Sequence, residues 1–197
     1  YGIYLEDEAN IESHEYYYGD ASLSHPGEWK KAHVARVMEM AHATVNNACV
    51  VIWSLGNEAG PGNNFVEAYN ALKAFDATRP VQYERNNDIV DMGSNQYPSI
   101  GWTQGAVTGK YGIKYPFHIS EYAHSMGNAV GNLIDYWEAI ESTNFFCGGA
   151  IWDWVDQSMY NYEKDGTRYL AYGGNFGDTP NDGQFVMNGI IFGDREP

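Results

Sequence analysis

Residues 49–62 read CVVIWSLGNEAGPG. A short apolar run ends at a glycine and an asparagine, and Glu58 comes directly after them. A continuous, β-branched run of this length is typical of a strand that is buried on both faces of a parallel sheet. The next segment has the spacing of an amphipathic helix, with one apolar face made of Phe65, Ala68, Tyr69, Leu72 and Phe75. A buried strand followed by a helix is the repeating unit of α/β proteins.

The same alternation extends in both directions along the chain. Further apolar, strand-like runs predict strands at residues 1–5, 81–83, 89–92, 117–120 and 149–152. Helical spacing of apolar residues predicts helices at residues 28–46 and 130–140. Segments rich in glycine and polar residues predict a loop at residues 15–27, a loop with one short helix at 99–116, and loops with small strands at 159–197.

Polar residues at the strand ends separate the two architectures that fit this alternation, a doubly wound sheet and a (β/α)8 TIM barrel. Most of them are acidic and each follows an apolar run: Glu8, Glu12, Glu58, Tyr97, Glu121 and Asp153. Several strands that each deliver a carboxylate to one rim are typical of the barrel. A nucleotide-binding doubly wound fold needs a glycine-rich turn after its first strand. Residues 56–60 instead carry a carboxylate where phosphate would approach, so we predict the barrel.

The length of the chain indicates only part of a barrel. A complete barrel takes about 250 residues, and the 197 residues here contain about six predicted strands. We therefore expect residues 1–197 to be one catalytic TIM-barrel domain with no second domain, truncated on its N-terminal side and holding about the last six strands. Residue 1 is not methionine and no signal segment follows it, so the sequence leaves the compartment open.

Composition excludes several classes of protein. Hydrophobic residues are 44% and charged residues 19%, which is ordinary for a globular domain. The 26 acidic residues against 11 basic ones give a net charge of −15, which disfavours nucleic acid and anionic lipid as partners. No stretch of about 18 apolar residues predicts a membrane span. Cys49 and Cys147 form no disulfide framework, and we expect both to be buried free thiols.

Aromatic residues are 15% of the chain, and many lie beside glycine. Aromatic faces stack on the C–H faces of sugar rings, so this composition favours carbohydrate binding, with an aromatic-rich core as the alternative. Residues 152–157 read WDWVDQ, where Trp152 either forms the floor of a sugar site or packs at the rim.

Glu58 and Glu121 are the candidate catalytic pair, because each ends a predicted strand in a glycine-, serine- or asparagine-rich context. Two carboxylates on one rim suit glycoside hydrolysis. The alternative is that both are solvated or cap the next helix. Glu12 and His14 lie two residues apart, so in an extended chain both point the same way and suit one hard divalent cation. A surface loop with an incidental histidine is the alternative there.

Taken together, these segments resemble the catalytic barrel of the β-galactosidases of glycoside hydrolase family 2. The matching stretches occur in the family's order along the whole chain: YGIY at 1–4, DEANIESH at 7–14, VIWSLGNEAG at 51–60, RPVQYE at 79–84, EYAHSMGN at 121–128, WDWVDQ at 152–157, YGGNFGDTPND at 172–182 and FVMNG at 185–189.

The resemblance implies that Glu58 is the general acid/base and Glu121 the nucleophile of a retaining hydrolase. It also implies a Mg²⁺ ion on Glu12, His14 and Glu58. These two roles of Glu58 oppose each other, because the acid must carry a proton when it meets the glycosidic oxygen whereas a bound cation favours the carboxylate.

The resemblance further implies the sugar contacts. Asn57 is expected to hydrogen-bond the 2-hydroxyl, Tyr97 and His124 to flank the nucleophile and the hydroxyls, and Trp152 to stack on the galactose face. A Na⁺ site that orders the sugar 6-hydroxyl maps in part onto the carbonyl of Phe185 and onto Asn188, without a carboxylate ligand in this chain.

The resemblance has limits, and other functions stay open. Residues 85–116, which include Tyr97, match the family only loosely. Ala59 favours the galactosidases, because the β-glucuronidase branch carries proline there. Expected partners are a β-galactoside such as lactose, flanking domains and further copies in a homo-oligomer, and we expect the isolated chain to have little or no activity. The alternatives are a non-catalytic carbohydrate-binding fragment, a β-glucuronidase-like glycosidase, and a metal-dependent hydrolase centred on Glu12 and His14.

Overall fold

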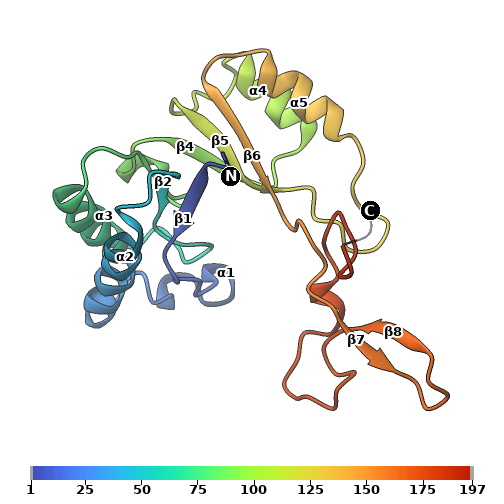
Figure 1. The fold of residues 1–197 in the computed structure, drawn as a ribbon. Helices are drawn as coiled ribbons and strands as arrows, with labels where there is room; N and C mark the ends of the chain where they lie inside the picture. The colour runs from blue at the N-terminus through green and yellow to red at the C-terminus, as the bar shows by residue number, and fades with distance from the viewer. Residues whose placement is uncertain (1, 196–197) are drawn as a thin grey trace. The chain divides into compact units, whose positions relative to one another are not determined.

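Strands and helices alternate along most of the chain (Figure 1), as the sequence predicts. The computed structural model describes residues 2–195. Its helices are α1 (Glu15–Tyr18), α2 (Lys30–Thr44), α3 (Asn63–Phe75), α4 (Ile100–Val107) and α5 (Leu133–Glu141). Its strands are β1 (Leu5–Glu8), β2 (Val50–Ser54), β3 (Val81–Gln82), β4 (Gly93–Gln96), β5 (Phe117–Tyr122), β6 (Phe146–Ile151), β7 (Met159–Tyr162) and β8 (Arg168–Ala171).

The chain divides into two units. The first unit comprises the described residues through Ser94 together with Gly112–His118. The second unit comprises Asn95–Tyr111 and the described residues from Ile119 on. β4 and β5 each contain the point at which the chain passes from one unit to the other. Each unit is therefore described by its own contacts.

The first unit contains a sheet in the order β1-β2-β3, and both pairings are parallel. β2 is the central strand, with Trp53 opposite Val81 on one side and Asp7 on the other. The predicted parallel arrangement of the apolar run at residues 49–55 is thus confirmed. α2 and α3 pack against each other beside this sheet (Figure 1), because each presents a buried stripe at helical spacing: His33, Val37 and Ala41 on α2, and Asn64, Phe65, Ala68 and Leu72 on α3.

A chain of hydrogen bonds, buried except at its Glu8 end, links side chains from β1, β2, β3 and the start of β4, all of them in the first unit. Ser54 Oγ donates to Glu8 Oε2 at 2.7 Å, and Gln82 Nε2 donates to Ser54 Oγ at 2.8 Å. Ser94 Oγ then donates to Gln82 Oε1 at 2.9 Å. Because unpaired polar groups are costly in a buried position, this chain favours the neighbour order β1 to β4.

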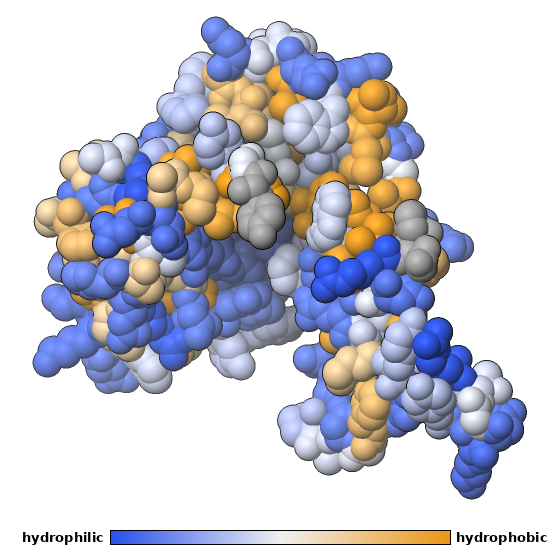
Figure 2. Space-filling model, viewed as in Figure 1, coloured by the Kyte–Doolittle hydropathy of each residue, from blue (hydrophilic) through white to orange (hydrophobic). Residues whose placement is uncertain are grey.

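The second unit contains most of a second sheet, in the order β4-β5-β6, with α4 and α5 and an antiparallel hairpin of β7 and β8. Hairpin apart, the described residues form six strands in two three-stranded sheets, which agrees with the six expected. Figure 2 shows hydrophobic atoms at the surface around α5, where the side chains of Ile134 and Trp137 are exposed.

Four sequence predictions are wrong in detail. Residues 15–27, predicted as a loop, begin with α1 (Glu15–Tyr18). The predicted strand at 89–92 is a turn, and β4 follows it, because the Asp91 carboxylate accepts the Val81 N–H at 2.9 Å while Val90 and Met92 are buried. The first strand begins at Leu5 rather than before it, and residue 1 lies outside the described residues. Cys147 is exposed, not buried.

The shift of the first strand has a physical cause. Glu6 and Glu8 belong to the strand because each has a partner in the first unit: Glu6 Oε2 lies 3.2 Å from His118 Nε2, and Glu8 accepts from Ser54. Acidic residues therefore occupy a strand that their charge alone would not predict. No helix of residues 2–195 is both long and apolar enough to cross a membrane.

Candidate functional site

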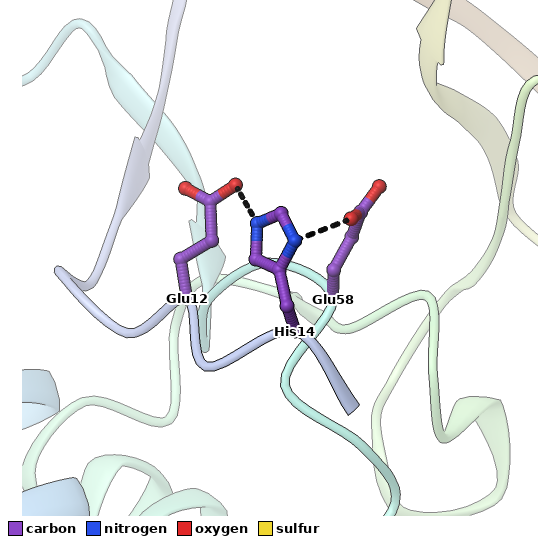
Figure 3. A group of neighbouring side chains, drawn as sticks. All are labelled: Glu12, His14 and Glu58. Carbon is purple, nitrogen blue, oxygen red and sulfur yellow. Dashed lines mark hydrogen bonds and ion pairs between the residues drawn. The ribbon is translucent and has the colours of Figure 1, made fainter. Parts of the chain in front are cut away.

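The segments that follow β1 and β2 bring Glu12, His14 and Glu58 together in the first unit, and Figure 3 shows the imidazole ring between the two carboxylates. His14 Nε2 lies 3.0 Å from Glu12 Oε1, and His14 Nδ1 lies 3.8 Å from Glu58 Oε2. One ligand atom from each residue lies within 4.8 Å of the others. The three residues predicted to share a cation are therefore neighbours.

Backbone hydrogen bonds hold the two segments against each other. The Asn57 N–H donates to the Ile11 carbonyl at 2.8 Å, and the Glu15 N–H donates to the Glu58 carbonyl at 2.8 Å. Gly56 has a φ of 142°, and a Cβ atom there would lie 2.6 Å from the Ile11 carbonyl oxygen. Only glycine permits this close approach, so the glycine after β2 is a condition for the site.

Three of the predicted site residues have a left-handed backbone although none is glycine. The φ angles are 48° at His14, 49° at Glu58 and 50° at Tyr97. Such conformations cost about 1–3 kcal/mol each and persist where surrounding contacts fix them, often at functional sites. Three of the predicted site residues are therefore among the seven described non-glycine residues with a positive φ.

The carboxylate of Glu58 is nearly buried and each of its oxygens has a partner. The Tyr16 hydroxyl donates to Oε2, and Arg85 Nη2 lies 3.7 Å from Oε1. The Glu58 N–H donates to Glu84 Oε1 at 2.8 Å. These contacts fix both the backbone and the side chain of the predicted acid/base.

Burial raises the pKa of the Glu84 carboxyl to about 7, although the Glu58 N–H and the Arg85 guanidinium act in the opposite direction. Sequence reasoning assigned no role to Tyr16, Glu84 or Arg85. A signal existed for Glu84, because it closely follows β3 just as the candidate acids follow other strands. No comparable signal marked Tyr16 or Arg85.

The side-chain amide of Asn57 faces the acidic cluster, because its Nδ2 donates to Glu12 Oε1 at 3.0 Å. A cavity of about 540 Å³ opens beside the cluster, lined by Glu12, Ser13, His14, Tyr17, Tyr18, Ala21, Ser22 and Leu23. The first unit therefore offers space next to the predicted cation ligands. The sugar contact expected of Asn57 stays a prediction.

In the second unit, Tyr97 lies beside Glu121. The Tyr97 hydroxyl donates to Glu121 Oε2 at 2.8 Å, and the Tyr97 N–H donates to the Glu121 carbonyl at 2.8 Å. The ring centroids of Tyr97 and His124 are 6.2 Å apart. Tyr97 directly follows β4, and Glu121 lies within β5 rather than after it. Tyr97 is thus a hydrogen-bond partner of Glu121, and its role beside the sugar stays a prediction.

The remaining predicted residues lie in the second unit after β6. Trp152 is 41% exposed, and its N–H donates to the Tyr122 carbonyl at 2.9 Å. Asn188 is buried, its carbonyl accepts the N–H groups of Ser125 and Asp153, and its Nδ2 donates to the Phe185 carbonyl at 2.8 Å. Asn188 thus connects three segments, and the Trp152 side chain is exposed to solvent.

Both predicted cation sites can be tested against these contacts. Glu12, His14 and Glu58 offer two carboxylates and an imidazole, a set that suits a divalent cation whose remaining ligands are water. Asn188 Oδ1 is buried and has no hydrogen-bond partner within residues 2–195, which leaves one oxygen donor next to the Phe185 carbonyl. The first set fits the predicted Mg²⁺, and the second fits part of a Na⁺ site.

Glu58 and its neighbours belong to the first unit, whereas Glu121, Tyr97, His124, Trp152 and Asn188 belong to the second. The pairing of Glu58 with Glu121 therefore stays a prediction. Within each unit, candidate site residues lie in strands or in the segments that directly follow them. Helices that alternate with such strands define the class of α/β proteins, to which the (β/α)8 barrels belong.

The chain belongs to glycosyl hydrolases family 2, because residues 1–197 match the TIM barrel domain of that family. It is 43% identical over 210 aligned residues to a β-galactosidase of Klebsiella pneumoniae (strain 342) and 41% identical over 213 residues to β-galactosidase 2 of Enterobacter cloacae. Both alignments cover 100% of the chain but only 20% of the relative. The chain thus spans about a fifth of the length of these relatives.

Solved structures agree on the fold. A β-glucuronidase of Ruminococcus gnavus matches with a TM-score of 0.56 at 17% identity, over 86% of this chain and 34% of that one. A β-galacturonidase of Eisenbergiella tayi matches with a TM-score of 0.54 at 16% identity, over 87% and 35%. At such identities the likeness concerns the fold alone, and it confirms the predicted TIM barrel.

Proposed function

We propose that the whole protein that carries this chain hydrolyses terminal β-galactosides, lactose among them, with retention of configuration. The observation that carries the proposal is the similarity over the entire chain to β-galactosidases at 40–43% identity. Glu58 and Glu121 lie within the segments that resemble that family. Ala59 supports a galactoside over a glucuronide as substrate, for the reason given above.

In the proposed reaction, Glu58 gives its proton to the glycosidic oxygen while the Glu121 carboxylate attacks the anomeric carbon. The bond to the leaving group breaks and a galactosyl ester of Glu121 forms. Glu58, now a carboxylate, takes a proton from water, the water oxygen attacks the anomeric carbon, and galactose leaves with Glu121 restored. This route requires the two carboxyl groups to lie about 5–5.5 Å apart.

The surrounding residues have proposed roles in this route. The Tyr97 hydroxyl donates to Glu121 at 2.8 Å, which suits a carboxylate that stays ionised and correctly aimed. Trp152 stacks on the galactose face, Asn57 hydrogen-bonds the 2-hydroxyl, and His124 contacts a hydroxyl group. Asn188 and the Phe185 carbonyl would hold Na⁺ near the 6-hydroxyl.

Glu12, His14 and Glu58 would hold Mg²⁺. When bound, the cation would stabilise the ionised form of Glu58 and restrict its side chain. Glu84 and Tyr16 already fix the same residue through its N–H and its carboxylate. We further propose that flanking domains complete the sugar site and that the whole protein is a homo-oligomer.

The test is an assay of the whole protein on matched aryl β-galactoside and aryl β-glucuronide substrates. We expect turnover of the galactoside, a β-configured first product by NMR, and a fluorosugar inhibitor trapped on Glu121 in a peptide digest. Galactose binding without turnover would favour the non-catalytic alternative. Faster turnover of the glucuronide would contradict the assigned substrate.

A further inference from the structure

Arg85 has no role in the proposed reaction, yet its guanidinium contacts three residues around Glu58. Nη2 lies 3.7 Å from Glu58 Oε1, and Nε lies 3.3 Å from Glu84 Oε1. The guanidinium carbon lies 5.5 Å from the centre of the Tyr16 ring, a cation–π distance. All four residues belong to the first unit, so these contacts lie within one unit.

The two oxygens of Glu58 face different partners. Oε2 accepts the Tyr16 hydroxyl and is the oxygen nearest to His14, at 3.8 Å from Nδ1. Oε1 is the oxygen nearest to Arg85. The cation ligands and Arg85 therefore engage opposite oxygens of one carboxylate.

Glu84 forms an ion pair with the same guanidinium. Its side chain is only 2% exposed, and the Oε1 atom that faces Arg85 Nε also accepts the Glu58 N–H. The Arg85 guanidinium therefore lies within ion-pair distance of two carboxylates, those of Glu84 and Glu58.

We infer that Arg85 is a positioning residue for Glu58 and that it weakens cation binding at the cluster of Glu12, His14 and Glu58. A positive charge next to a ligand carboxylate reduces the attraction of that carboxylate for a second cation. The same ion pair restrains the Glu58 side chain. The inference rests on the proposed function only in taking Glu58 as the acid/base and the cluster as a cation site.

The first experiment measures Mg²⁺ affinity by calorimetry on the whole protein after chelation. Arg85→Met removes the charge but keeps a side chain of similar length, and we expect its Kd for Mg²⁺ to fall about three- to tenfold. Arg85→Lys keeps the charge and should bind Mg²⁺ as the wild type does. Lys30→Met is the matched control, because it removes one positive charge from α2, where Lys30 Nζ faces Glu67 at 4.0 Å.

The gain in affinity should disappear when Glu12→Gln is combined with Arg85→Met, which assigns it to this cluster. The inference is overturned if Arg85→Met binds Mg²⁺ no more tightly than Lys30→Met, if the gain persists beside Glu12→Gln, or if neither the wild type nor Arg85→Met binds Mg²⁺. If Arg85→Met fails to fold, Arg85→Gln, which retains a donor toward Glu84, takes its place.

The second readout is kinetic. We expect Arg85→Met to lower kcat on an aryl β-galactoside about tenfold with little change in KM, since a small displacement of a catalytic group affects the chemical step more than binding. Arg85→Lys should restore part of kcat. An unchanged kcat would refute the positioning role. If the wild type does not turn over the galactoside, the proposed function fails, whereas the Mg²⁺ titrations still decide the effect of Arg85 on the cation site.

Discussion

Each unit contains one of the two predicted catalytic glutamates, and each glutamate accepts a hydrogen bond from a tyrosine of its own unit. Tyr16 donates to Glu58 in the first unit, and Tyr97 donates to Glu121 in the second. Both glutamates lie at or beyond strands that sequence patterns predict. In this respect the two surroundings are alike.

They differ in burial. Glu58 is buried, lies next to Arg85 and His14, and has its N–H bound by the carboxylate of Glu84. Glu121 is only half-buried, within β5. Two carboxylates of one site take different roles when their surroundings differ. The contrast therefore supports unlike roles for Glu58 and Glu121.

The units also differ in packing. The main cluster of buried apolar residues lies in the first unit and includes Trp53, Phe65, Leu72 and Tyr83. The second unit has many large exposed side chains, among them Trp154 at 61% and Phe192 at 56%. Apolar burial is the dominant source of folding free energy, so we expect the first unit to be the more stable one.

The largest effect should come from replacing the two glutamates. We expect Glu121→Gln to lower kcat/KM about 10³-fold or more on every galactoside. The loss should not depend on the leaving group, because even a good leaving group cannot compensate for a missing nucleophile. Glu58→Gln should cost about 10²–10⁴-fold on an alkyl galactoside, whose leaving group needs a proton. On a dinitrophenyl galactoside, whose leaving group needs none, kcat/KM should stay close to that of the wild type.

The measurement is a series of steady-state assays over leaving groups of different basicity. Aspartate replacements at both positions serve as controls that keep the carboxylate. A leaving-group dependence in Glu121→Gln but not in Glu58→Gln would reverse the two assignments.

Much of this contrast was predictable from the sequence. The apolar run at residues 49–55 followed by helical spacing predicted β2 and α3, and the strand-end position of Glu58 predicted a site residue. The i, i+2 spacing of Glu12 and His14 predicted that their side chains lie close together. The strand, the helix and the proximity of Glu12 to His14 are confirmed, because hydrophobic period and short spacings are local properties of a sequence, whereas the role of Glu58 stays a prediction.

The remainder depended on contacts between distant residues. Tyr16, Glu84 and Arg85 surround Glu58 only after three loops have folded, and no local pattern distinguishes them from solvated residues. The acids of β1 lie in a strand because Ser54 and His118 meet them. Likewise, residues 89–92 form a turn because the Asp91 carboxylate binds β3 rather than water.

A pair of core replacements tests the difference in packing. Phe65 is fully buried and stacks on Tyr83 at 4.1 Å between ring centroids, so Phe65→Ala should destabilise the first unit by about 3–5 kcal/mol. Phe192→Ala, at an exposed site, should change the stability of the second unit by less than about 0.5 kcal/mol. Hydrogen exchange measured by mass spectrometry reports the two units separately. Equal losses of protection would contradict the expected difference.

Asp76 allows the stability of the first unit to be tested through its dependence on pH. Burial alone would raise the pKa of its carboxyl, but hydrogen bonds from Thr78, Arg79 and Trp53 outweigh burial and hold the pKa well below its usual range. A lowered folded-state pKa means that the stabilisation is complete above the ordinary pKa of 3.8 and declines as the pH falls below it.

Asp76→Asn should therefore cost about 3 kcal/mol near neutral pH, because it leaves Arg79 without its buried partner. The difference from the wild type should shrink as the pH falls below about 4. Urea unfolding across this pH range measures it. Asp178→Asn in the second unit is the control, because the Asp178 carboxylate is exposed and accepts the Gly174 N–H with both oxygens, at 3.0 and 3.1 Å, rather than pairing with a buried cation. A pH-independent cost of Asp76→Asn would show that lost packing, not charge, is responsible.

The smallest expected effects on activity concern Tyr16 and Tyr97, the two tyrosines that donate hydrogen bonds to the glutamates. Tyr97→Phe removes a hydrogen bond to a carboxylate, which is worth about 1.5–3 kcal/mol, so kcat should fall about tenfold or more. Tyr16→Phe should have a smaller effect, because Arg85 and Glu84 still hold Glu58 when the hydroxyl is gone. Steady-state assays on one aryl galactoside compare both variants. Equal losses of kcat would mean that Glu58 depends on its tyrosine as much as Glu121 does, against the expected difference. A larger loss of kcat for Tyr16→Phe would mean that the Tyr16 hydroxyl, and not the contacts with Arg85 and Glu84, is the main restraint on Glu58.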